Sequence, residues 1–280
     1  MTSDARARPA VRPGRRIGGV PAAHLAVPGT ALVVLAVLAW LLTVRQARGM
    51  ATMPGTMGMD VPAFLAMWTA MMAAMMFPSV APVAVSWVRS IATRSTGWTR
   101  GARLTAFVGG YLLAWVAYGA AAYAALAGAE RLVDHAPTAA QWAGAAIFVA
   151  AGAYQLTPLK DVCLNHCRSP LAQLLHYGRY TGPLRDLRVG LHHGAYCVGC
   201  CWGLMLTLVA VGVMNVAVMA GIAAVIFTEK LWRYGRHVAK ALGVGLIVLG
   251  ALVPAYPDLA PALAPRHGPA APMDMGDMKM

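Results

Sequence analysis

The sequence predicts an all-α, polytopic transmembrane helix bundle of about seven helices, with the N-terminus inside and the C-terminus outside. Hydrophobic residues make up 59% of the 280 residues and charged residues only 12%, about half the charged share of an average soluble domain. The net charge of +13 comes from Lys and Arg residues that lie in separate clumps between apolar stretches. A nucleic-acid-binding protein would instead gather its bases on one face of a soluble domain. We therefore expect a lipid bilayer, and no nucleic acid, around this chain.

Six stretches without Asp, Glu, Lys or Arg predict the spans, because about 20 apolar residues cross the hydrocarbon core as a helix. They are residues 17–44, 61–88, 104–129, 135–159, 189–228 and 241–256. The first is followed by Arg-Gln-Ala-Arg rather than by small residues at a cleavage site, so we expect a retained helix and not an export signal. The fifth has 40 residues and must turn once. Gly212 and Asn215 tolerate turn conformations, so the turn is predicted at residues 212–215, which gives seven helices.

The distribution of basic residues orients this bundle. With the N-terminus in the cytoplasm, 18 of the 23 Lys and Arg residues lie on the inner side. The inner segments are residues 1–28, 86–103, 157–189 and 229–240. This bias obeys the positive-inside rule and supports an odd number of helices. The chain is accordingly divided into a basic cytoplasmic tail (1–28), a transmembrane domain (29–256) and an external Pro- and Met-rich tail (257–280) that we expect to be disordered.

All five cysteines fall in two short motifs on the predicted cytoplasmic side. The motifs are Cys163-Leu164-Asn165-His166-Cys167 and Cys197-Val198-Gly199-Cys200-Cys201, and His192 and His193 precede the second by about one turn. In each motif the first, fourth and fifth residues have the spacing that shares one face of a helix. Disulfides are rare in the reducing cytosol, where clustered cysteines more often bind metal or carry out redox chemistry. The candidate ligands are Cys163, His166, Cys167, His192, His193, Cys197, Cys200 and Cys201.

Methionine is the second unusual residue type, with 17 copies. Thioethers are soft ligands that do not form disulfides, so closely spaced methionines suit Cu(I) capture in an oxidising compartment. One group forms a stripe along the second predicted helix and another lies in the external tail. The candidate thioether ligands are Met67, Met71, Met72, Met75, Met76, Met273, Met275, Met278 and Met280. In the helix, gap filling between packed helices is an equal alternative, whereas packing does not explain the tail.

Three segments, in this order, resemble a bacterial family of predicted metal-binding integral membrane proteins that is catalogued as domain of unknown function 2182. The segments are residues 67–78, 154–167 and 197–205, the last followed by 212–215 and Glu229-Lys230. The resemblance covers roughly residues 60–250. It implies metal binding by a multi-pass protein of the bacterial inner membrane, without an established activity.

These patterns favour an integral membrane protein that handles copper(I) through Met, Cys and His ligands, by capture, transfer or transport. Zinc at Cys163, His166 and Cys167 is the alternative metal. No acid–base pair lies within the predicted spans, so no catalytic residue is assigned. Two other functions stay open, a membrane thiol oxidoreductase using Cys197 and Cys200 and a scaffold or assembly factor for a metalloprotein. The expected partners are lipid, the metal ion, and a metallochaperone or membrane metalloprotein.

Overall fold

The computed structural model describes residues 22–50, 55–91, 95, 97–169 and 175–264, and every regular element within these residues is a helix. In chain order they are α1 (Ala22–Met50), α2 (Val61–Ile91), α3 (Gly97–His135), α4 (Pro137–Gln155), α5 (Pro158–Arg168), α7 (Arg185–Val211), α8 (Val216–Leu231), α9 (Gly235–Leu252) and the 3₁₀ turn η1 (Pro257–Leu259). The all-α prediction is confirmed for these residues. Most of both predicted tails, residues 1–21 and 265–280, lies outside them.

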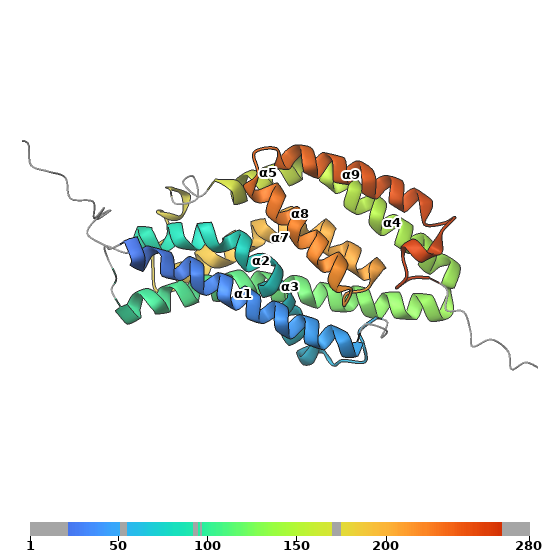
Figure 1. Ribbon diagram of the computed structural model, residues 1–280, viewed down its shortest axis with the longest axis horizontal. Coiled ribbons are helices and arrows are strands. Elements are labelled where there is room, and N and C mark those ends of the chain that lie inside the picture. The colour runs from blue at the N-terminus through green and yellow to red at the C-terminus, as the bar shows by residue number, and fades with distance from the viewer. Residues whose placement is uncertain (1–21, 51–54, 92–94, 96, 170–174, 265–280) are drawn as a thin grey trace, which may run out of the picture.

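The long helices run roughly along the long axis of the molecule and alternate in direction (Figure 1). The most extensive packing joins α3 to α7, α1 to α2 and α4 to α9. The most apolar window of α2 is 78% buried and that of α7 is 61% buried, against 22% for each of α1, α3 and α9. The two helices that hold most of the candidate Met and Cys ligands therefore form the interior of the bundle.

Five of the described helices are long and apolar enough to cross a membrane, namely α1, α2, α3, α7 and α9. The other two predicted spans also contain helices, α4 and α8, but neither is among the five, and α8 has only 16 residues. A helix thus forms in each of the seven predicted segments. Seven membrane crossings and the N-in, C-out orientation stay predictions.

Apolar side chains cover the outside of α1. Val34, Leu38 and Leu41 are 56%, 56% and 57% exposed. Extended exposed apolar surface is rare on soluble monomers and marks contact with lipid or another protein. The outward face of α1 therefore suits a bilayer.

Local sequence accounts for where the helices end. Gly212 has a φ of +111° at the end of α7, a backbone conformation that favours glycine. The Asn215 side chain accepts a hydrogen bond from the Val218 amide at 3.1 Å and caps α8. The turn predicted at residues 212–215 is thus confirmed. In contrast, α3 continues past its predicted end at residue 129, because no glycine or proline interrupts residues 129–136.

Glycines set the close contact between α3 and α7. A Cβ atom added to Gly110 would lie 2.1 Å from the Leu187 carbonyl oxygen, and one added to Gly190 would lie 1.9 Å from the Phe107 carbonyl oxygen. Both clashes are with backbone, so a side chain is accommodated only if the helices separate. Next to Gly110, a Cβ added to Gly109 would meet nothing within 4 Å.

We expect Gly110→Ala to lower the stability of the protein by about 1–3 kcal/mol, the usual cost of overpacking. Gly109→Ala on the same helix should be neutral or slightly stabilising, because alanine is the better helix former. Circular dichroism of the detergent-purified variants during heating compares the two midpoints. Equal unfolding midpoints for the two variants would show that α3 and α7 accommodate a side chain at Gly110 without loss of stability.

Candidate metal centre

Four cysteine side chains gather in the interior, where α5 packs against α7. The Cys200 Sγ lies 3.2 Å from the Cys201 Sγ and 3.8 Å from the Cys167 Sγ. The sulfur atoms of Cys197, Cys200 and Cys201 all lie within 4.8 Å of one another. Each of the four side chains is at most 8% exposed, and all four are free thiols. These four residues are called the thiol cluster below.

The spacing of the sulfur atoms fits a single metal ion. An ion at the centre of a triangle with sides of at most 4.8 Å lies no more than about 2.8 Å from each sulfur, and small side-chain rotations close the gap to a metal–sulfur bond of about 2.3 Å. Soft thiolates select Cu(I), Zn(II) or iron–sulfur clusters over hard cations. The donor set therefore fits a thiophilic ion.

The structure joins one residue of the first cysteine motif to the second motif and leaves the other two apart. Cys167 lies on the buried face of α5 and reaches the thiol cluster. Cys163 packs against Gly199, where an added Cβ would lie 2.9 Å from its sulfur. The His166 imidazole instead contacts the Tyr177 hydroxyl at 2.9 Å. Cys163, His166 and Cys167 are thus not brought together around one point.

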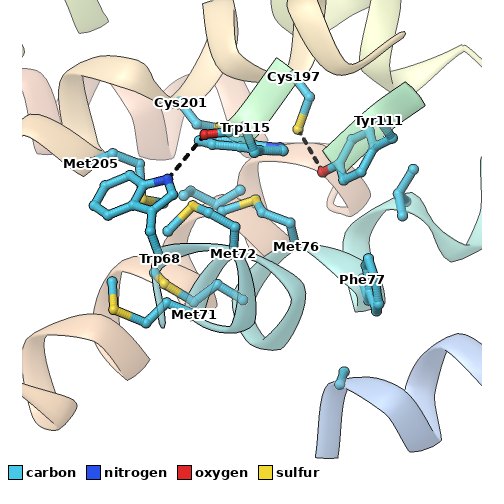
Figure 2. Close-up of a cluster of buried hydrophobic side chains, with 14 of the residues drawn as sticks. Trp68, Met71, Met72, Met76, Phe77, Tyr111, Trp115, Cys197, Cys201 and Met205 are labelled. Carbon is cyan, nitrogen blue, oxygen red and sulfur yellow. Dashed lines mark hydrogen bonds between the residues drawn. The ribbon is translucent and has the colours of Figure 1, made fainter. Parts of the chain in front are cut away.

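Lys230 from α8 supplies a positive charge to the thiol cluster. Its Nζ donates hydrogen bonds to the Cys197 Sγ at 3.0 Å and to the Ser79 Oγ at 3.3 Å, and the residue is only 7% exposed. The Tyr111 hydroxyl lies 3.1 Å from the same sulfur (Figure 2). An adjacent ammonium group favours the thiolate over the thiol. Cys197 is therefore the cysteine best prepared to act as a charged ligand.

A second buried charge pair fixes α5 against α8. Lys160 and Glu229 are each 1% exposed in their side chains, and the Lys160 Nζ lies 2.7 Å from the Glu229 Oε2. The Gln155 Nε2 donates to the other carboxylate oxygen at 3.3 Å, and the Gln155 Oε1 accepts from the Lys160 Nζ. Lys160 and Cys167 share the buried face of α5, so this network also holds Cys167 toward α7.

The methionine stripe of α2 is fully enclosed. Its members are at most 4% exposed, and they are Met67, Met71, Met72, Met75 and Met76. In the view of Figure 2, Met72 and Met76 lie on the α2 side of Trp115, and Cys197 and Cys201 lie on its α7 side. Burial of this kind suits both thioether ligation and gap filling. The four candidate methionines of the tail, residues 273, 275, 278 and 280, lie outside the described residues.

His166 and Cys167 are neighbours on α5, but their pKa values shift in opposite directions. Burial, with repulsion from His192 and His176, lowers the pKa of His166 to about 4, so its imidazole is neutral at physiological pH and able to bind a cation. The pKa of the Cys167 thiol is raised well above its usual range, first because it hydrogen-bonds to Cys197. Cys167 therefore carries a proton that a bound metal ion must displace.

Sequence reasoning missed several residues around this centre. His176 and Tyr177 contact the candidate ligands His166 and His192, and no spacing rule pointed to them. Lys160 shares the i, i+4, i+7 pattern of Leu164 and Cys167, which was a usable signal for one buried face. Tyr111 reaches Cys197 from α3, a helix distant in sequence. Lys230, which the resemblance included without a role, reaches the same sulfur from α8.

Comparison with known proteins gives one match. A model of the PpoB2 family, described as a copper chaperone, matches residues 65–253. No curated protein and no solved structure matches the chain. The matched range contains α7, α8, the thiol cluster and the methionine stripe. The match shows that this chain belongs to a copper-related family, and the identity of that family with domain of unknown function 2182 stays a prediction.

Proposed function

Because the chain belongs to the PpoB2 copper chaperone family, we propose that it is an integral membrane protein that binds Cu(I) at the thiol cluster and passes it to another protein. The single observation that supports this most strongly is the set of four buried, reduced cysteines within metal-binding reach. Copper is the cargo in this function and not a resident cofactor. The cargo reaches the cluster as Cu(I) and leaves it as Cu(I).

Charge balance favours Cu(I) over Zn(II) as the cargo. Two thiolates around Cu(I) leave one unit of negative charge, which the Lys230 ammonium beside Cys197 offsets. Four thiolates around Zn(II) leave two units, and an uncompensated buried charge is costly. Cys163 and His166 do not join Cys167 around one point, which weakens the support for the alternative zinc site.

The thiol oxidoreductase has less support. Thiol–disulfide exchange requires that a partner reach a sulfur atom, and Cys197 and Cys200 are each only 1% exposed. A scaffold with purely structural cysteines would leave unexplained why Lys230 is buried against the Cys197 sulfur.

We also propose that the chain crosses the bacterial inner membrane seven times, with the N-terminus in the cytoplasm. The apolar face of α1 and the positions of the basic residues support this. Because α8 has 16 residues, it is about 24 Å long, which is short for a membrane crossing. This length is consistent with its charged end, Glu229-Lys230, being buried in protein rather than in lipid.

The test is elemental analysis of the detergent-purified protein, expressed with copper and zinc both supplied. A variant with all five cysteines changed to serine is purified in parallel. We expect about one copper per chain in the native protein and almost none in the variant, with little zinc in either. Native protein without copper, or a variant that retains it, would overturn the proposal.

The methionine stripe allows a separate prediction about copper entry. We expect the double variant M72L/M76L to fold normally, because a Met-to-Leu exchange conserves volume and costs less than about 1.5 kcal/mol per site. If these thioethers guide the ion, Cu(I) loading of the purified protein should slow several-fold while the final copper content stays unchanged. Met219→Leu, in an equally buried methionine on α8, is the control. Unchanged loading would show that the stripe only fills space.

A further inference from the structure

Four histidines lie between the thiol cluster and the surface where α5 meets the start of α7. His176 stacks on His192 with ring centroids 5.1 Å apart. His166 follows, 5.6 Å from His192 and 6.3 Å from His193. The four come from α5, from the helical turn at residues 175–177 and from α7. The ring centroids of successive histidines are thus 5.1, 5.6 and 6.3 Å apart.

Exposure falls along this series in one direction. His176 is exposed, His192 and His166 are half-buried, and His193 is only 3% exposed. Beyond His193, the Tyr111 ring stacks on its imidazole at 6.0 Å, and the Tyr111 hydroxyl contacts the Cys197 sulfur. The series therefore starts at the aqueous surface and ends beside the thiol cluster.

His193 holds one of the buried side-chain polar atoms that have no hydrogen-bond partner among the described residues, namely its Nδ1. Leaving such a group without a partner is costly. A phenylalanine at this position would provide the stacking without that cost. A buried imidazole nitrogen without a partner is available to bind a metal ion, and neutral imidazole is a common metal ligand.

Tyr177 orients the two histidines in the middle of the series. Its hydroxyl lies 2.9 Å from the His166 Nε2 and 3.4 Å from the His192 Nδ1, and the residue is 1% exposed. The Tyr177 hydroxyl thus contacts one ring nitrogen of each of these two histidines and restrains both rings. The Tyr196 ring stacks on His166 with ring centroids 3.9 Å apart and restrains it further.

We propose that His176, His192, His166 and His193 form an imidazole route along which Cu(I) passes between the thiol cluster and the aqueous surface. The inference rests on the proposed function. No three of these histidines bring ligand atoms within 4.8 Å of one another in the described residues, so they do not form one closed site. Imidazoles hold Cu(I) less strongly than thiolates do, and an ion handed from one to the next therefore exchanges quickly.

The test measures the release of Cu(I) from the loaded, detergent-purified protein. Bathocuproine disulfonate, a water-soluble Cu(I) chelator, reports release by its absorbance. We expect the double variant H176A/H192Q to hold the same copper at equilibrium but to release it at least about tenfold more slowly, which corresponds to a transfer barrier raised by about 1.4 kcal/mol. His237→Ala, in an exposed histidine on α9 that contacts Tyr234, should release copper at the native rate.

The outcomes separate the route from the function on which it rests. Native release in H176A/H192Q, with copper held by the thiol cluster, would overturn the route alone. Loss of equilibrium copper in that variant would also overturn it, because the histidines would then be ligands of the resting site. Native protein without copper would overturn the proposed function and the route together. His176→Ala, at an exposed position, should slow release in the same direction and covers the case in which the double variant misfolds.

Discussion

Substitution of Cys200 by serine is expected to lower the affinity for Cu(I) by more than about 100-fold, beyond the loss seen when residues that merely support a metal site are removed. Cys200 is the central sulfur of the thiol cluster, within 4 Å of both the Cys201 and the Cys167 sulfurs. A hydroxyl at this position is a poor ligand for a soft ion. The measurement is competition between the purified protein and bathocuproine disulfonate for Cu(I).

Cys163→Ser provides the matched control. Cys163 lies in the other cysteine motif and packs against Gly199, outside the group of sulfurs that share one point. It is also only half-buried, so a serine should be tolerated there. We expect a near-native affinity. An equal loss of affinity in both variants would contradict the assignment of the site to Cys167, Cys197, Cys200 and Cys201.

Substitution of Glu229 by glutamine is expected to destabilise the protein by about 3–5 kcal/mol, the cost of leaving a buried charge unpaired. Lys160 would lose its carboxylate partner at 2.7 Å in a position where both side chains are 1% exposed. For a chain of this size, such a loss lowers the unfolding midpoint by roughly 10 °C. Heating of the detergent-purified variant, followed by circular dichroism, measures the shift.

The double variant K160M/E229L separates the charge pair from simple packing. It removes both charges, and replacement of a buried ion pair by apolar side chains is often neutral or stabilising. We expect its midpoint to return close to the native value. A double variant as unstable as E229Q would mean that the network, including Gln155, is needed for its hydrogen bonds rather than for charge balance.

The predictable part of the fold follows from spacing along the chain. The lengths of the apolar stretches predicted seven helical segments, and the structure has a helix in each. Gly212 and Asn215 predicted the turn inside the longest stretch, and the structure has a turn there. The end of α3 was less predictable, because a helix continues past its apolar stretch until a breaker such as Pro137 intervenes.

The candidate site was predictable only in part, because its members meet through tertiary packing. The i, i+3, i+4 spacing identified Cys197, Cys200 and Cys201, which one helix brings together by itself. It also grouped Cys163 with Cys167, whereas the packing of α5 on α7 sends only Cys167 to the thiol cluster.

The buried charges were the least predictable feature. Glu229 and Lys230 stand at the end of an apolar stretch, where polar residues usually face water. Their burial depends on Lys160 and Cys197, which come from other helices. One sequence without its packing partners gives no sign of such a pairing.

X-ray absorption at the copper edge tests the thiol cluster most directly. The native protein, loaded with one equivalent of Cu(I), should show a first coordination shell made only of sulfur. The same measurement on the Cys200→Ser variant should show that shell lost or replaced by lighter atoms. A nitrogen- or oxygen-dominated shell in the native protein, or an identical sulfur shell in both proteins, would contradict copper binding at these four cysteines.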